Sequence, residues 1–234
     1  MICMIYIMVL YDIYSVIFKY YNFTFQFIYL LILILYIMGG SILPITIHNN
    51  KVYLLFGKER DIDENPGWSD FGGGSDKGEN LFQTASREGS EELTGFLGSK
   101  NDIKLLLNKY GTYNIDYNSQ GYPTYRCHIF PMEYDSMLPF YYNNNQNFLQ
   151  SNLDPNIIKN TKIFEKTQIK WFSLDEIKKN KKKFRKFYQH IINLILEKKN
   201  DIETFARTHI HSKYINKQIN KTKKYKTTKT KKKI

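Results

Sequence analysis

Three glutamates lie close together in one segment of the chain and could bind a metal ion. Glu88, Glu91 and Glu92 are spaced by three and four residues, so on a helix their side chains would share one face. Carboxylates packed this closely repel each other unless a cation neutralises them. Oxygen ligands without His or Cys suit Mg²⁺ or Mn²⁺, which bridge phosphate oxygens and activate water. Because most acidic helix faces are simply solvated, the surrounding residues must decide between the two interpretations.

The residues around these glutamates resemble the Nudix box, which reads G-x5-E-x7-R-E-U-x-E-E-x-G-U, where U is aliphatic. Its fixed residues occur here at the right spacing, at Gly73, Glu79, Arg87, Glu88, Glu91 and Glu92. A match of this length is far more specific than a lone glycine motif. The match favours a metal-binding face over a solvated one.

Two positions depart from the motif. Gly89 stands at the first aliphatic position and costs about 1 kcal/mol of helix propensity. With Ala85 one turn earlier, it would let the helix lie close to a sheet. Thr94 stands where the motif has glycine, and Gly95 follows one residue late. These departures affect the loop after the helix and displace no carboxylate.

The resemblance implies an α/β Nudix fold, with a mixed β-sheet sandwiched between helices. It also implies a hydrolase that uses Mg²⁺ or Mn²⁺ to cleave a phosphoanhydride bond in a nucleoside-diphosphate-linked substrate. Residues at the metal-binding positions of the family are Glu88, Glu91, Glu92 and the backbone carbonyl of Gly72.

The resemblance assigns further roles around the metal. Glu79 and Arg87 match an ion pair that orients the helix and its ligands, although an ordinary surface pair remains the alternative. The general base varies within the family. It is either a box glutamate, Glu88 or Glu92, or a later acid ahead of a tryptophan-containing strand. Glu165, six residues before Trp171, is the best later candidate.

Glu133 is the second candidate for a later general base. A structural role for either later acid is an equally open interpretation.

The box itself reports chemistry and leaves the substrate open. The segment WSDFGGG followed by REGSEELTGFLG looks most like Nudix proteins of large DNA viruses, including mRNA decapping enzymes. Capped RNA is therefore one candidate substrate, and aromatic side chains could stack on its base. Candidates for stacking are Trp68, Tyr125, Phe140, Tyr141 and Tyr142. The alternatives are a pyrophosphatase acting on free nucleotides, dinucleoside polyphosphates or inositol pyrophosphates, and a non-catalytic Nudix fold that binds nucleotide or RNA.

The chemistry requires a helix beneath the glutamates, and the spacing of small and apolar residues predicts one over 80–93. These residues recur every three or four positions, at Phe82, Ala85, Gly89 and Leu93. Gly95 offers a C-cap. The glycines at 72–74 predict a flexible turn before the helix, where the backbone can approach metal and phosphate.

Short strands and further helices must hold this helix in place. The pattern predicts strands over 42–47, 52–56, 125–132 and 169–172, with a polar turn at 48–51 between the first two. Ser173 and Glu176 form a capping box, which predicts a helix continuing to about Lys199. A short helix or turn is expected at 103–107, and loops are expected at 58–66 and 143–155. Strands broken by two main helices indicate a mixed α/β layer fold.

The chain divides into three parts by composition. Residues 39–200 form the expected catalytic domain. The chain as a whole is 42% hydrophobic, which is enough for a core. Residues 201–234 form a basic tail, expected to be disordered, with ten lysines and no acid from Lys213 to Ile234. Such a tail would attract a polyanion such as RNA, or would merely improve solubility. Cys3 and Cys127 form no metal-binding pair, and a reducing cytoplasm, that of the host for a viral protein, is the expected setting.

Residues 1–38 are strongly apolar and allow three interpretations. They could be a membrane anchor, a signal peptide, or translated sequence upstream of a protein that begins at Met38. No small-residue cleavage site is evident for a signal peptide. Because the domain pattern begins directly after Met38, we favour the third interpretation over an anchor. The sequence leaves the oligomeric state open.

Overall fold

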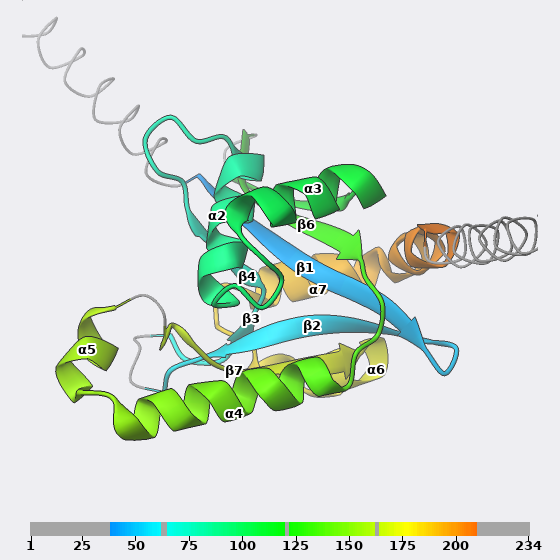
Figure 1. Ribbon diagram of the computed structural model, residues 1–234. Helices are drawn as coiled ribbons and strands as arrows, with labels where there is room; N and C mark the ends of the chain where they lie inside the picture. Colours follow the sequence, from blue (N-terminus) through cyan, green and yellow to red (C-terminus); the bar gives the residue numbers. More distant parts are fainter. Residues whose placement is uncertain (1–37, 62–64, 120–121, 162–163, 210–234) are drawn as a thin grey trace, which may run out of the picture.

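The computed structural model describes residues 38–61, 65–119, 122–161 and 164–209. Within these ranges, seven strands form one sheet in the order β3-β2-β1-β6-β5, with β4 paired to β1 and β7 paired to β2 (Figure 1). The strands are β1 (Gly39–His48), β2 (Lys51–Glu59), β3 (Trp68–Ser69), β4 (Phe71–Gly74), β5 (Tyr113–Ser119), β6 (Tyr122–Pro131) and β7 (Lys166–Ser173). β1 and β6 run parallel and the other pairs are antiparallel. The sheet is therefore mixed.

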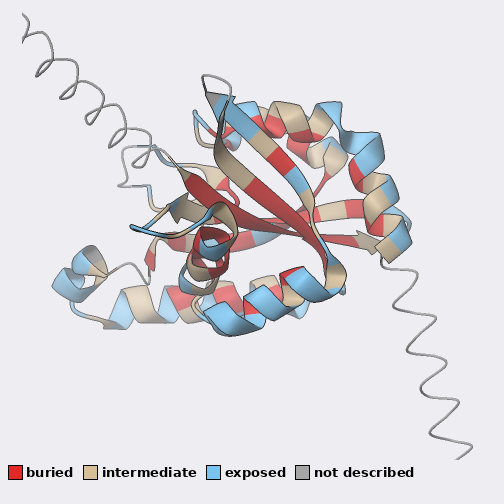
Figure 2. Cartoon of the chain, turned by 90° about the horizontal axis from the view of Figure 1, so that it is seen from above, coloured by how far each residue is buried: buried red, intermediate tan, exposed pale blue. Residues whose placement is uncertain are grey.

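Helices cover both faces of this sheet, because residues alternate between its two sides along each strand. Ile42 and Leu55 face one core, shared with α2 (Leu81–Glu92), α3 (Lys100–Tyr110) and α4 (Met137–Asn152). Leu43 and Leu54 face the other core, shared with α6 (Leu174–Lys179), α7 (Gln189–Glu197) and the helical residues 199–209. Figure 2 shows buried strands running between helices whose outer sides are exposed. The predicted α/β sandwich is confirmed.

The helix α2 begins and ends where local chemistry requires. Asn80 caps its first turn, and Gln83 completes a capping box with the Asn80 backbone. At its other end, Thr94 and Gly95 both adopt left-handed backbone angles, with φ of 48° and 75°. Position 94, where the motif has glycine, therefore adopts the left-handed conformation that glycine favours, although the residue here is a threonine.

Close contact between α2 and the sheet explains the glycine at position 89. A Cβ atom placed on Gly89 would lie 2.4 Å from Cδ1 of Ile42 in β1. Ile42 fills the space that an aliphatic side chain at position 89 would otherwise occupy. The first departure from the motif is therefore a packing exchange between α2 and β1.

The chain between β1 and β2 forms the tight turn that the polar residues predict. Asn49 and Asn50 have φ of 47° and 60°, the pattern of a two-residue hairpin turn that asparagine tolerates. Both strands extend beyond their predicted limits, and so does β6. The strand β5 was not predicted, because its sequence Tyr113–Ser119 lacks a continuous apolar run.

Two predictions of local structure are wrong. Residues 72–74 belong to β4, where they pair with β1, instead of forming a flexible turn. The predicted loop 143–155 is mostly helix α4, with α5 (Pro155–Asn160) after it. Asparagine-rich sequence disfavours a helix locally, but the buried side chains of Leu138, Tyr142 and Gln146 anchor α4 by tertiary packing.

The C-terminal elements also differ from the prediction. The capping box at Ser173 does begin a helix, α6, but this helix ends at Lys179. A 3₁₀ turn, η2 (Lys181–Lys183), and a buried Phe184 separate it from α7. Helical residues continue to 209, with Ile202 and Ala206 fully buried, so the predicted start of the tail at residue 201 is wrong.

Two predictions concern residues outside the described ranges. The apolar segment 1–38 lies outside them except for Met38, as does the lysine-rich part of the tail from 210 onward. Within the ranges that the structure describes, every helix falls short of the length and hydropathy needed to cross a bilayer.

Candidate metal centre

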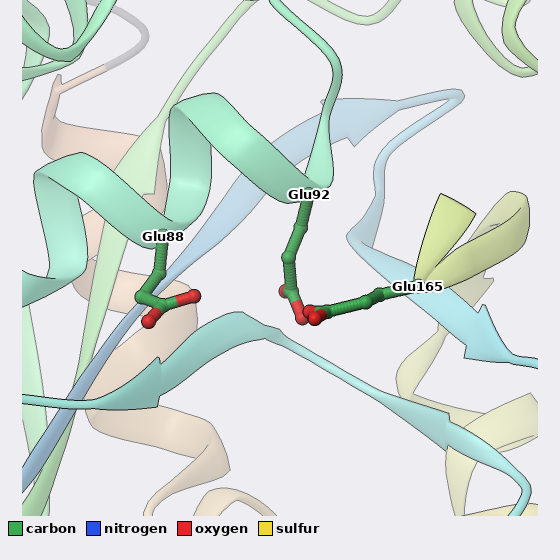
Figure 3. Close-up of side chains that lie close together, drawn as sticks. All are labelled: Glu88, Glu92 and Glu165. Carbon is green, nitrogen blue, oxygen red and sulfur yellow. The ribbon is translucent and has the colours of Figure 1, made fainter. Parts of the chain in front are cut away.

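Two glutamates of α2 and one from a distant segment come together at one point. Glu88 and Glu92 lie one turn apart and are buried, with 6% and 4% of their surfaces exposed. Glu165 precedes β7 directly and is half-buried. Figure 3 shows Glu88 and Glu92 on the same side of α2, with Glu165 reaching toward Glu92. One carboxylate oxygen from each residue lies within 4.8 Å of the other two.

Glu91 is not part of this cluster. Its side chain is 42% exposed and lies 3.4 Å from Nη1 of Arg87. The side of α2 that faces the sheet holds Glu88 and Glu92, which leaves Glu91 on the solvent side. Helical spacing alone grouped the three residues, but packing against the sheet separates them.

Arg87 connects Glu88 to the residues before the helix. Its guanidinium lies 2.9 Å from Oε2 of Glu79 and donates to Oε1 of Glu88 at 2.7 Å. It also donates to the carbonyl oxygen of Gly74 at 3.0 Å. Hydrogen bonds from Arg87 lower the pKa of Glu79 to about 2. The predicted ion pair between Glu79 and Arg87 is therefore present. Arg87 also holds one oxygen of Glu88.

Glu92 is held by groups from two strands. The backbone N–H of Gly72 donates to its Oε2 at 2.7 Å, and Nζ of Lys166 lies 3.3 Å from its Oε1. Burial raises the pKa of Glu92 well above its usual value, Lys166 opposes this change, and nearby Glu59 adds to it. Gly72 was expected to contribute its carbonyl oxygen to a metal, and the contact present here is through its amide.

The cluster has the donor set of a hard divalent cation. All three groups are carboxylates, which suit Mg²⁺ or Mn²⁺ and do not suit softer metals. Buried carboxylates this close to each other are unfavourable without a compensating positive charge. Arg87 and Lys166 supply part of this charge, and a bound cation would add to it. The three residues therefore fit the expected metal.

Lys166 is a site residue that the sequence did not reveal. It is 1% exposed, forms an ion pair with Glu59 and donates to Oγ of Ser69 at 2.8 Å. Arg185 also contacts Glu59, through Nη1 at 2.8 Å. The alternation of β7 could have placed Lys166 on the same face as Gln168 and Lys170, but its burial depends on β2 and β3, which are distant in sequence.

A small hollow lies along β4, and none of the three glutamates lines it. It has a volume of about 220 Å³ and is lined by residues that include Ser69, Asp70, Gly72, Gly73, Tyr125, Arg185 and Phe187. Gly73 connects the hollow to the metal centre, because a Cβ atom placed there would lie 2.7 Å from the Glu88 carboxylate. The guanidinium of Arg185 lies 4.8 Å from the centre of the Phe187 ring. The hollow thus places a cation and an aromatic ring beside β4, the strand whose Gly72 and Gly73 lie against Glu92 and Glu88.

The remaining predicted residues lie elsewhere. Glu133 is exposed and lines a separate cavity of about 390 Å³, with Leu106 and Tyr110 of α3. Of the aromatic side chains considered for stacking, Tyr125 lines the hollow along β4. Tyr142 is fully buried, Trp68 packs against Phe172, and Phe140 and Tyr141 are exposed on α4.

No known protein family and no curated protein matches the chain. Among solved structures, an Ap4A hydrolase from C. elegans has 17% identity and a TM-score of 0.38, covering 70% of this chain and 95% of that one. RenU, a Nudix hydrolase from M. smegmatis, has 12% identity and a TM-score of 0.43, covering 71% and 88%.

A bifunctional NMN adenylyltransferase/ADP-ribose pyrophosphatase from Francisella tularensis, complexed with AMP and a manganese ion, has 18% identity and a TM-score of 0.42. It covers 69% of this chain and 41% of that one. With TM-scores below 0.5 these likenesses carry no argument about this chain, and the interpretation of the site rests on its own geometry.

Proposed function

We propose that this chain is a Nudix-type hydrolase that cleaves a phosphoanhydride bond in a nucleoside-diphosphate-containing substrate. One observation carries the proposal: carboxylate oxygens of Glu88, Glu92 and Glu165 lie within 4.8 Å of one another. The two helix residues stand at metal-binding positions of the Nudix box, and Glu165 is the acid expected ahead of the tryptophan-containing strand. Motif and geometry thus select the same site by separate routes.

In this proposal the three carboxylates hold Mg²⁺ or Mn²⁺. When bound, the cation supplies Lewis-acid chemistry that neutralises charge developing on the diphosphate oxygens. Arg87 fixes Glu88, while Gly72 and Lys166 fix Glu92. Glu91 lies on the solvent side of α2 and is not one of the residues that hold the cation.

We assign the general base to Glu165, because it is more exposed than Glu88 and Glu92 and can contact water. The carboxylate oxygen of Glu165 that does not hold the cation accepts a proton from a water molecule, whose oxygen forms a bond to one phosphorus. The bond from that phosphorus to the bridging oxygen breaks, and the bridging oxygen leaves on the second phosphate. The products are two phosphorylated fragments.

The hollow beside Gly73 is our proposed place for the nucleotide. Arg185 would face its phosphates, and the exposed ring of Phe187 would stack on its base. At about 220 Å³ the hollow is smaller than the roughly 300 Å³ of a typical complete ligand pocket. It would therefore hold one part of the substrate and leave the rest in solvent.

We propose the 5′ cap of mRNA as the substrate. The WSDFGGG and box segments support this choice by their resemblance to viral decapping enzymes, and the ten lysines after residue 212 could attract RNA phosphates. A free nucleotide or dinucleoside polyphosphate is the second candidate, favoured by the small size of the hollow.

The test is a substrate panel for the full chain with Mg²⁺ and with Mn²⁺. Capped RNA, free nucleotides, dinucleoside polyphosphates and inositol pyrophosphates are compared by separating the products. Excess uncapped RNA should inhibit cap cleavage if the protein binds its substrate through the RNA chain. Lack of inhibition would favour the small substrates. No turnover of any substrate with either metal would leave only the non-catalytic binding fold.

Two matched variants test the metal centre itself. Glu92→Gln should reduce turnover by more than the roughly 100-fold that loss of an outer partner can cost, with the fold retained. Glu91→Gln makes the same change one position earlier on the exposed side of α2, and it should reduce turnover much less. Full activity of Glu92→Gln would refute the assignment.

A further inference from the structure

A buried lysine lies beside the acidic cluster and contacts one of its members. Lys166 is the first residue of β7 and pairs across the sheet with Glu59 of β2, where a register shift interrupts the pairing. Its ammonium contacts Glu59, donates to Oγ of Ser69 at 2.8 Å and lies 3.3 Å from Oε1 of Glu92. Three elements therefore supply the surroundings of one buried cation.

The sheet is shaped to let this side chain pass. A Cβ atom placed on Gly57 in β2 would lie 2.8 Å from Cδ and 3.0 Å from Cγ of Lys166. The same Cβ would lie 2.9 Å from Cε1 of Phe71, so a larger residue at position 57 would press on both the lysine stem and this ring. Gly57 thus keeps open the path along which Lys166 reaches Glu92.

The two oxygens of Glu92 receive contacts from different strands. Gly72 in β4 holds Oε2 at 2.7 Å, and Lys166 in β7 approaches Oε1. The backbones of Glu92 and Lys166 are also joined through Tyr142. Its hydroxyl lies 2.7 Å from the Glu92 carbonyl oxygen and 3.2 Å from the Lys166 carbonyl oxygen. The orientation of the Glu92 carboxylate is therefore set by Lys166 and Gly72 together.

Stability alone is a weak reason for such an arrangement. Replacing a buried ion pair by apolar residues of similar size is often neutral or stabilising, whereas removing one partner is costly. An ordinary pair between Lys166 and Glu59 would also need no contact with Glu92. The shared contact indicates a role in the acidic cluster.

We propose that Lys166 is a positioning residue, which orients the carboxylate of Glu92 so that it can bind a divalent cation together with Glu88 and Glu165. Glu59 in turn holds the ammonium of Lys166 in place. The inference rests on the proposed metal centre. It adds two residues that lie outside the Nudix box, and it assigns Gly57 the role of keeping their path open.

The main test is Mn²⁺ binding to the full chain without substrate, measured from the electron paramagnetic resonance signal of free Mn²⁺. The double variant Lys166→Met with Glu59→Gln removes one positive and one negative charge, so the net charge near the cluster is unchanged. Methionine follows the path of the lysine stem past Gly57. We expect binding about 10–100-fold weaker than in the unmodified chain, the usual effect of removing a group that orients a ligand.

The same strand offers a matched control. Lys170 and Glu176 form an exposed pair 3.5 Å apart, with side chains 52% and 40% exposed. Lys170→Met with Glu176→Gln makes the same chemical changes and should bind Mn²⁺ as the unmodified chain does. Thermal unfolding without metal establishes that each variant is folded.

Each outcome decides the inference. Mn²⁺ binding equal to or tighter than that of the unmodified chain, in the folded Lys166–Glu59 variant, would show that Lys166 only neutralises Glu59. If that variant does not fold, Gly57→Ala keeps every charge but displaces the lysine stem, and unchanged Mn²⁺ binding there would overturn the proposal. Failure of the unmodified chain to bind Mn²⁺ would overturn the metal centre as well, which separates the two failures.

Discussion

The hydroxyl of Tyr142 offers a sensitive test of how the acidic cluster is assembled. Tyr142 lies fully buried on α4, and its hydroxyl donates to the carbonyl oxygen of Glu92, the last residue of α2. Burial raises the pKa of Tyr142 well above its usual value, so the phenol keeps the proton that it donates. The carbonyl oxygen of Lys166 lies 3.2 Å from the same hydroxyl. One oxygen atom thus joins the end of α2 to the start of β7.

Tyr142→Phe removes this atom and leaves the ring in its place. The Glu92 carbonyl loses a buried donor, and the cost of such a loss is about 1–3 kcal/mol. We therefore expect the free energy of unfolding to fall by about 1–3 kcal/mol, measured by urea denaturation without metal. Mn²⁺ affinity should also fall, because the hydroxyl no longer joins the backbone of Glu92 to that of Lys166, the residue after Glu165.

Tyr141→Phe provides the control for this prediction. It removes the same atom from the neighbouring residue, which is 58% exposed, and such surface changes stay within about 0.5 kcal/mol. If Tyr142→Phe were as stable as Tyr141→Phe, the hydroxyl would not hold the two segments together. Contact with α4 would then not position the cluster.

Two further predictions concern the packing and the pH dependence of the domain. Gly89→Leu should lower the free energy of unfolding by about 1–3 kcal/mol in urea denaturation, because the new side chain meets Ile42. Adding Ile42→Ala should recover part of this loss. If the effects of the two substitutions simply add, the two side chains do not compete for the same space. Burial, with Arg126 nearby, lowers the pKa of His128 to about 4 from 6.5, so its contribution to stability is complete above pH 6.5 and is lost as the pH falls toward 4. Between pH 7 and 4.5 the unmodified chain should lose about 2 kcal/mol of its free energy of unfolding through His128. The His128→Asn variant should therefore lose about 2 kcal/mol less over the same pH range. Equal losses in the variant and the unmodified chain would rule out His128 as the cause.

Features that depend on neighbouring residues could be read from the sequence. The periodicity of Ala85, Gly89 and Leu93 predicted α2, and the capping box at Ser173 predicted the start of α6, because both depend on contacts within one or two turns. The polar turn at Asn49 and Asn50 was predicted for the same reason. The spacing of the glutamates likewise identified the segment that carries the cluster.

Other features depend on parts of the chain that meet only in the folded state. The asparagine-rich segment of α4 looks like a loop, and it becomes a helix because Tyr142 is buried against β7 and the end of α2. The break between α6 and α7 follows from the burial of Phe184 beside Phe56 of β2. Local propensity is a weak guide wherever such distant packing outweighs it.

The same division applies to the site. Sequence by itself determined that Glu88, Glu91 and Glu92 share a helix, since three- and four-residue spacing is a property of the helix alone. Tertiary structure decided that Glu88 and Glu92 face inward while Glu91 does not, because that depends on which side of α2 packs against β1 and β4. It also decided that Glu165 and Lys166 join the cluster, since the sheet brings the start of β7 beside β2 and α2 across more than seventy residues of chain.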